Sequence, residues 1–142
     1  MIEQQPGVYQ MTVSIPHIGL TCSTEEKADR FYGGLLGLEK QASKSLDAAL
    51  AMTIFQLPEE AVFSVCNYAN GSIRFEIFVN SRFSVDPGRV NHICIEVDSL
   101  PDFLQKCEDL GVSCRQIPKG EKVLTFIRDF DGNLFEVVEK PA

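Results

Sequence analysis

The chain has 142 residues, a formal net charge of −7 and 44% hydrophobic residues, which suffices for one folded domain with an apolar core. The acidic balance excludes a nucleic-acid backbone as partner, because phosphates require a basic surface and the 13 lysines and arginines are scattered. No apolar run is long enough to cross a bilayer, and residues 1–6 lack the basic and apolar parts of a secretory signal. We therefore expect a cytoplasmic protein that binds neither nucleic acids nor membranes.

The first half of the chain predicts one helix among four strands. In chain order the expected elements are a polar arm (residues 1–10), a strand (11–22), a helix (23–37), and strands at 46–55, 61–68 and 73–79. Ser23 and Glu26 form a capping box at the start of the helix. Residues 48–52 could also be helical, because three of the five are alanines. The Asn70-Gly71 pair predicts a hairpin turn between the last two strands.

The second half repeats this order. After a linker (residues 81–89) with a turn around Asp86, the expected elements are a strand (90–97), a helix (about 99–110), a weakly marked strand (114–117), and strands at 122–128 and 134–139. Asp98 or Ser99 caps the helix and Gly111 ends it. The chain is thus predicted to form two βαβββ modules, residues 11–80 and 90–142. Since each module has too small a core alone, we expect both to pack into one α+β domain.

Cysteine usage favours a reduced interior. The five cysteines are odd in number, include no C-x-x-C pair and fall partly within apolar strand or helix patterns: Cys22, Cys66, Cys94, Cys107 and Cys114. Free core cysteines are therefore expected rather than disulfides. Cys94 differs from the others because the strand alternation places it on the same face as a histidine.

The two histidines of the chain occupy equivalent places in the two modules. His17 and His92 each begin a strand that is followed by a capped helix. With period two, His92, Cys94 and Glu96 share one face of their strand, opposite an aliphatic face. A lone strand histidine is typical of a hydrogen-bonded core or rim residue. Two histidines in matching positions instead favour ligands.

Each module also ends with a strand that carries a glutamate between apolar neighbours, Glu76 and Glu136. A glutamate there is costly to bury unless it is paired, protonated or bound to a metal. Two neutral imidazoles and two carboxylates around a divalent ion sum to zero charge, which predicts a site for Zn, Ni, Co, Mn or Fe held by His17, Glu76, His92 and Glu136. The alternative is that both glutamates are solvated edge residues with arginines as partners.

These residues resemble the vicinal oxygen chelate superfamily, which includes glyoxalase I, methylmalonyl-CoA epimerase, fosfomycin and bleomycin resistance proteins and extradiol dioxygenases. Residues 17–20 are similar to its opening strand, and residues 91–98 to the strand of the epimerase. Residues 128–132 followed by Glu136 are similar to the closing motif of glyoxalase I, with Phe130 in place of the usual proline. The resemblance implies two βαβββ modules in one curved mixed sheet around a metal cavity, and the same four ligands.

The resemblance also implies an activity. A four-ligand set is more similar to glyoxalase I and the epimerase than to the fosfomycin-modifying enzymes or dioxygenases, which use two histidines and one glutamate. It implies a metal-dependent lyase or isomerase, like lactoylglutathione lyase, that moves a proton next to a carbonyl while the metal stabilises an enediolate. Glu136 is the first candidate for the base and Glu76 the second. Glu96 lies about 13 Å along the strand from His92 and is expected at the cavity rim.

Several alternatives follow from the same resemblance. One is an acyl-CoA epimerase, another is a non-catalytic small-molecule-binding or resistance protein, and a third is an Fe(II) dioxygenase. In each case the partner is a small molecule. A homodimer is expected, with the metal site complete in one chain or formed across two.

Overall fold

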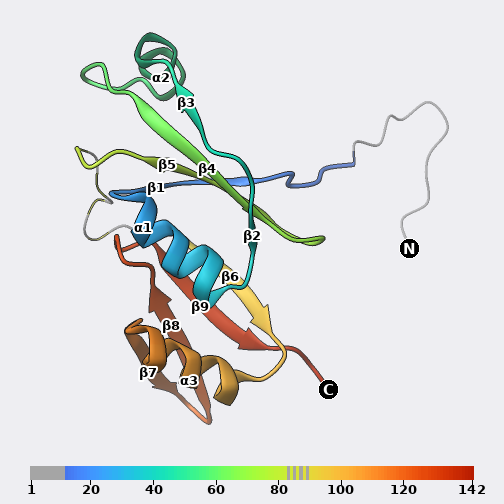
Figure 1. The fold of residues 1–142 in the computed structure, drawn as a ribbon. Helices are drawn as coiled ribbons and strands as arrows, with labels where there is room; N and C mark the ends of the chain where they lie inside the picture. Colours follow the sequence, from blue (N-terminus) through green and yellow to red (C-terminus); the bar gives the residue numbers. More distant parts are fainter. Residues whose placement is uncertain (1–11, 83, 85, 87, 89) are drawn as a thin grey trace, which may run out of the picture.

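The computed structural model describes residues 12–82, 84, 86, 88 and 90–142, whose strands form two separate sheets (Figure 1). The predicted arm and part of the predicted linker lie outside the described residues. The elements are, in chain order, β1 (Ile18–Cys22), α1 (Glu25–Ala28), η1 (Asp29–Leu35), β2 (Glu39–Lys40), β3 (Lys44–Leu46), α2 (Ala48–Phe55), β4 (Phe63–Ala69), β5 (Arg74–Val79), β6 (His92–Val97), α3 (Leu100–Leu110), β7 (Cys114–Lys119), β8 (Lys122–Arg128) and β9 (Leu134–Glu139).

The two sheets share one topology. In the first sheet the order is β1-β5-β4-β2, with β3 also paired to β4, and in the second it is β6-β9-β8-β7. The first strand of each module lies parallel to its last strand, β1 with β5 and β6 with β9. The predicted α+β fold with two equivalent modules is therefore confirmed.

The implied single curved sheet is wrong in one respect: among the described residues no backbone ladder joins β1 to β6. Both strands are at the edge of their own sheet. Between these edges lies a cleft of about 710 Å³ lined by residues of both strands. Side chains make hydrogen bonds across this junction, among them Asn133 Nδ2, which donates to Thr21 O at 3.0 Å.

The hydrophobic core is shared by both modules. Tyr32 of η1 contacts Phe75 of β5 with ring centroids 5.2 Å apart, and Phe31 contacts Phe135 of β9 at 5.3 Å. Phe75 and Phe135 are themselves 6.0 Å apart, and all four residues are fully buried. The helices α1 and η1 therefore lie between the two sheets, and one face of each sheet is buried against this core (Figure 1). Because strand side chains alternate, the opposite face of each sheet points away from this core; we call it the open face, although α2 covers part of it in the first sheet.

Three local predictions need correction. The cap of the first helix is Thr24 rather than Ser23: Thr24 Oγ1 accepts from Lys27 N at 3.2 Å, while Ser23 Oγ accepts from Lys27 Nζ. After one α-turn the helix widens into the π-helical η1, which contains the Gly33-Gly34 pair. Glycine has a low helix propensity, so this stretch holds the α-helical geometry weakly.

The second correction concerns the strand predicted at residues 46–55. The structure has a short strand, β3, followed by the helix α2, which was the stated alternative. Asp47 caps this helix, because its carboxylate accepts from Leu50 N at 3.1 Å. The alanines that follow favour helix over strand. The helix lies at the end of the first sheet that is farther from the second sheet (Figure 1).

The strand predicted at residues 11–22 is too long, because β1 begins at Ile18 and residues 12–17 pair with no other strand. Apart from residues 46–55, the other predicted elements agree with the structure to within two residues at each end. Strands β8 and β9 have the predicted bounds, Ser99 caps α3, and Gly111 ends it with a φ of 73°. The weakly marked strand is β7, longer than predicted. All five cysteines are free, as expected. None of the described helices has the length and apolar character needed to cross a membrane.

Candidate metal-binding site

His17 and Glu76 meet on the open face of the first sheet. Register between β1 and β5 places Gly19 opposite Glu76, and His17, two residues before Gly19, faces the same way. His17 Nε2 lies 3.2 Å from Glu76 Oε2, and their side chains are 48% and 23% exposed. The pair is thus accessible to a ligand. The two atoms can hydrogen-bond to each other or bind one cation together.

His92 and Glu136 occupy the corresponding positions on the second sheet. Register between β6 and β9 sets Cys94 opposite Glu136 and His92 opposite Leu134. The Nδ1–H of His92 donates to Val90 O at 2.9 Å, since a carbonyl can only accept. This bond leaves the lone pair on Nε2 available for a cation, as in metal sites where the second ring nitrogen is held by a carbonyl.

Cys94 lies between these two predicted ligands. The residue is largely exposed, but partial loss of solvent around its sulfur, followed by the charges of Glu136 and Glu96, raises the pKa of its thiol. The thiolate is the form that binds metals, so the carboxylates nearby disfavour Cys94 as a ligand. Its position next to Glu136 follows from the strand register.

One chain does not bring the four predicted ligands together. Within the part of the chain that the structure describes, no three or more His, Cys, Asp or Glu side chains are grouped so that they could hold a metal ion. The two pairs lie on different sheets, and each sheet packs its opposite face against the shared core. His17 and Glu76 are adjacent, whereas His92 and Glu136 lie on the second sheet. We call each pair a candidate half-site.

The donor set of each half-site fits a divalent cation. One imidazole nitrogen and one carboxylate per half-site is a mixture that Zn, Mn, Co, Ni and Fe accept. The second half-site also borders the cleft between the two sheets, which is lined by His92, Arg128 and Asn133 among others. Arg128 is held there because its Nη1 donates to Gly132 O at 2.7 Å. A small molecule bound at His92 would therefore reach hydrogen-bonding groups.

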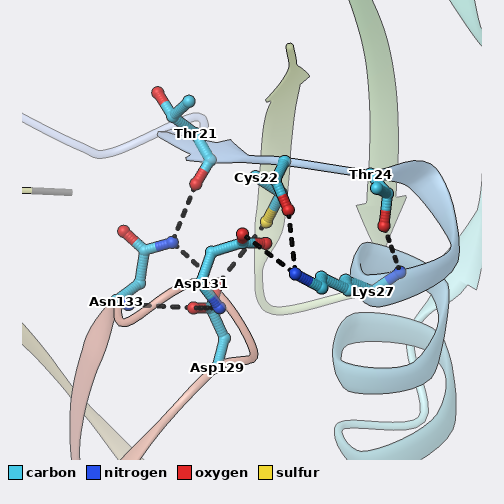
Figure 2. A network of polar contacts seen from close by, with 8 residues as sticks. Thr21, Cys22, Thr24, Lys27, Asp129, Asp131 and Asn133 are labelled. Atoms are coloured by element: carbon cyan, nitrogen blue, oxygen red, sulfur yellow. Dashed lines mark hydrogen bonds and ion pairs between the residues drawn. The ribbon is translucent and has the colours of Figure 1, made fainter. Parts of the chain in front are cut away.

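A buried carboxylate, missed by the sequence analysis, joins the two modules (Figure 2). Asp129 accepts from Tyr32 Oη at 2.8 Å, from Asn133 N at 2.8 Å and Asn133 Nδ2 at 2.7 Å, and from Asp131 N at 3.0 Å. The Cys22 thiol also lies 3.5 Å from it. Burial and then the charge of Asp129 raise the pKa values of Tyr32 and Cys22. The network positions the turn that leads into β9 and Glu136.

The edge of this network reaches the surface. Lys27 Nζ lies 3.9 Å from Asp131 Oδ1, so the side chain of Lys27 on α1 points toward the turn that contains Asp129 and Asp131 (Figure 2). The only sequence signal for the network was the closing motif itself, residues 128–132. Its partners on β1 and η1 are about a hundred positions away, which no local pattern reveals.

Comparison with known proteins supports the architecture. The sequence profile of the glyoxalase/bleomycin resistance protein/dioxygenase superfamily matches residues 14–137. No curated protein matches the sequence at a significant level. A glyoxalase family protein from Bacillus cereus is similar in structure with a TM-score of 0.70 and 11% identity, covering 94% of this chain and 97% of the other.

Two further solved structures are similar. A glyoxalase family protein from Enterococcus faecalis has a TM-score of 0.65 and 20% identity, covering 87% of this chain and 95% of that one. A mutant of the fosfomycin resistance protein FosX from Listeria monocytogenes, in complex with Mn(II) and a dihydroxypropylphosphonic acid, has a TM-score of 0.68 and 20% identity, covering 90% and 93%. At these identities the likeness establishes the fold alone.

Proposed function

Since the chain belongs to the glyoxalase/bleomycin resistance protein/dioxygenase superfamily, we propose that it is a divalent-metal-dependent enzyme acting on a small molecule. The proposed reaction is that of a glyoxalase I-like lyase or isomerase, in which a proton moves next to a carbonyl group. The observation that supports this most is the contact of His17 Nε2 with Glu76 Oε2 at 3.2 Å. It pairs an imidazole with a carboxylate on an open sheet face, as a four-ligand site requires.

The complete site is proposed to form between two copies of the chain. His17 and Glu76 of one copy would meet His92 and Glu136 of the other when the open faces of the two sheets come together. This arrangement covers both open faces and makes use of half-sites that one chain keeps apart. A homodimer of this kind has two equivalent sites, because its interface is symmetric.

In the proposed reaction, the metal ion and the residues around it have different roles. A divalent cation would supply Lewis acidity toward substrate oxygens that become negative during the reaction. Glu76 is engaged by His17, which suits a ligand that stays in place. The carboxylate of Glu136 makes no hydrogen bond or ion pair within the described residues, so it is the freer of the two to take a proton. Arg128, held by Gly132 O, can orient an anionic part of the substrate.

The test combines metal analysis with turnover. Purified protein is expected to contain a divalent metal that is lost in His17→Ala and His92→Ala and kept in Glu108→Gln, a matched change on the exposed face of α3. Protein stripped of metal is expected to regain turnover of a 2-oxoaldehyde hemithioacetal when Ni or Zn is added. If the wild-type protein takes up no metal, or turns over equally without it, the proposal is wrong.

A further inference from the structure

An apolar pocket lies on the open face of the first sheet, under α2. Its walls are Phe55, Leu57, Phe63 and Phe78, and its floor is the part of β1 around Gly19. The volume is about 260 Å³, and none of the described residues that line it is charged. A cavity of about 150 Å³ already holds one benzene molecule. The pocket therefore has room for one six-membered ring with a short attachment.

The three phenylalanines present ring edges and faces to this space. Phe78 contacts Phe55 with centroids 5.1 Å apart and an interplanar angle of 76°, and Phe63 at 6.2 Å and 85°. Phe55 and Phe63 are 6.1 Å apart at 70°. Near-perpendicular rings at these distances are the arrangement that aromatic pairs prefer. A further aromatic ring can join such a cluster with the same geometry, which a straight alkyl chain cannot.

The helix α2 maintains the pocket. Ala51 on this helix is fully buried and packs in one cluster with Phe63 and Ala61. This contact holds the end of α2, and with it Phe55, over the sheet. Ile54, the residue before Phe55, is 54% exposed and does not line the pocket. Phe55 and Ile54 are thus neighbours in sequence with different surroundings.

The pocket borders the predicted ligand pair. Gly19 lies opposite Glu76 in the ladder and also lines the pocket. Phe78 is two residues beyond Glu76 on β5, which places it on the same face at about 7 Å along the strand. A Cβ added at Gly19 would lie 3.3 Å from the Phe78 ring, so the glycine lets this ring approach β1. The spacing of about 7 Å between Glu76 and Phe78 along the strand is short enough for one small molecule to contact both the His17–Glu76 pair and the pocket.

We infer that the substrate carries an aryl group next to its oxygen-bearing carbons, and that this group is bound in the pocket of Phe55, Phe63 and Phe78. The inference rests on the proposed function for the position of the oxygens. The aryl group would be held by α2 while the oxygens face His17 and Glu76. Substrates in which the aryl group is replaced by methyl would bind the same polar residues with much lower affinity.

The first measurement does not depend on metal. Saturation transfer to benzyl alcohol is observed by NMR with wild-type protein, Phe55→Ala and the matched control Ile54→Ala. We expect transfer in the wild type and in Ile54→Ala, and its loss in Phe55→Ala. Phe55 is 41% exposed, so its truncation should leave the fold intact, and a thermal melt checks this. No transfer in the wild type, or equal transfer in Phe55→Ala, overturns the inference.

The second measurement connects the pocket with the metal site. Calorimetry compares benzohydroxamate with acetohydroxamate, two chelating probes that differ by phenyl against methyl, on Zn-loaded protein. We expect the phenyl probe to bind at least about tenfold more tightly, and the preference to disappear in Phe55→Ala only. Equal affinities overturn the inference even if benzyl alcohol binds. Failure of the protein to load Zn counts against the proposed function, and the NMR measurement then still decides on the pocket.

Discussion

The two modules have the same topology but different surroundings on their open faces. The first has its histidine and glutamate in contact, and the helix α2 with its aromatic pocket beside them. In the second, His92 is held by a backbone carbonyl and lies 6.1 Å from Phe126, which lines another apolar pocket with Ile117 and Leu134. Among the described residues of this module, no helix corresponds to α2. Both modules thus carry an apolar pocket beside their histidine, and they differ in the helix that covers it only in the first.

The largest expected effect tests whether the half-sites act together. Glu136→Gln is expected to lower turnover by about 10²- to 10⁴-fold, because a positioned base is removed. The Glu76→Gln variant is expected to lose both its bound metal and its turnover. A mixture of the two inactive variants, refolded together, should regain about a quarter of wild-type turnover, since half of the dimers would be mixed and each would contain one intact site. The readout is hemithioacetal turnover before and after mixing.

Mixing each variant with itself is the control for this complementation. Turnover that stays absent in the mixture, while size measurements show mixed dimers, would mean that all four groups belong to one chain.

The next effect concerns the network that joins the modules. Asp129→Ala should lower the free energy of unfolding by about 3 kcal/mol, because the Tyr32 hydroxyl and two Asn133 donors lose their buried acceptor. Urea denaturation measures it. Asp98→Ala, which removes an exposed contact to Lys140, is the matched control and should cost less than about 1 kcal/mol. Equal costs for the two variants would contradict the role of Asp129.

Alkaline pH should weaken the same junction. Burial and Asp129 raise the pKa values of Tyr32 and Cys22 above their ordinary values of 10.0 and 9.0, so the folded chain retains protons that the unfolded chain releases. Stability is therefore fully present below pH 9.0 and falls as the pH rises above it. Tyr32→Phe should reduce the steepness of this fall in urea titrations taken at several pH values. An identical pH profile for Tyr32→Phe would show that its hydroxyl does not contribute.

The smallest expected effect concerns the stability of the helix α2 compared with that of α3. Asp47→Ala removes the cap of α2 and should destabilise that helix by about 1 kcal/mol. Amide exchange should then accelerate at Leu50 and its neighbours, with no change in the second module. Ser99→Ala removes the cap of α3 and is the matched control, for which acceleration is expected only in α3. Acceleration across the whole chain in Asp47→Ala would mean that α2 unfolds only with the core.

The sequence by itself determined the repeated modules, the bounds of β8 and β9, the free cysteines and the end of α3 at Gly111. These features depend on alternation, capping and turn residues, whose hydrogen bonds reach only a few positions along the chain. It also indicated the superfamily, because the resemblance lay in short motifs. For α2 the local sequence was compatible with a strand or a helix, and the structure forms a helix that Asp47 caps and that begins with alanines.

Only the tertiary structure decided which surfaces the candidate ligands share. Alternation showed that His17 and Glu76 could face one side, but the register of β1 with β5 placed them in contact. His92 and Glu136 lie on the other sheet, and within the described residues they do not join that pair in a group that could hold a metal ion. The Asp129 network spans 97 positions to Tyr32. Such contacts follow from how two modules pack, and packing is a property of the whole chain that no local segment encodes.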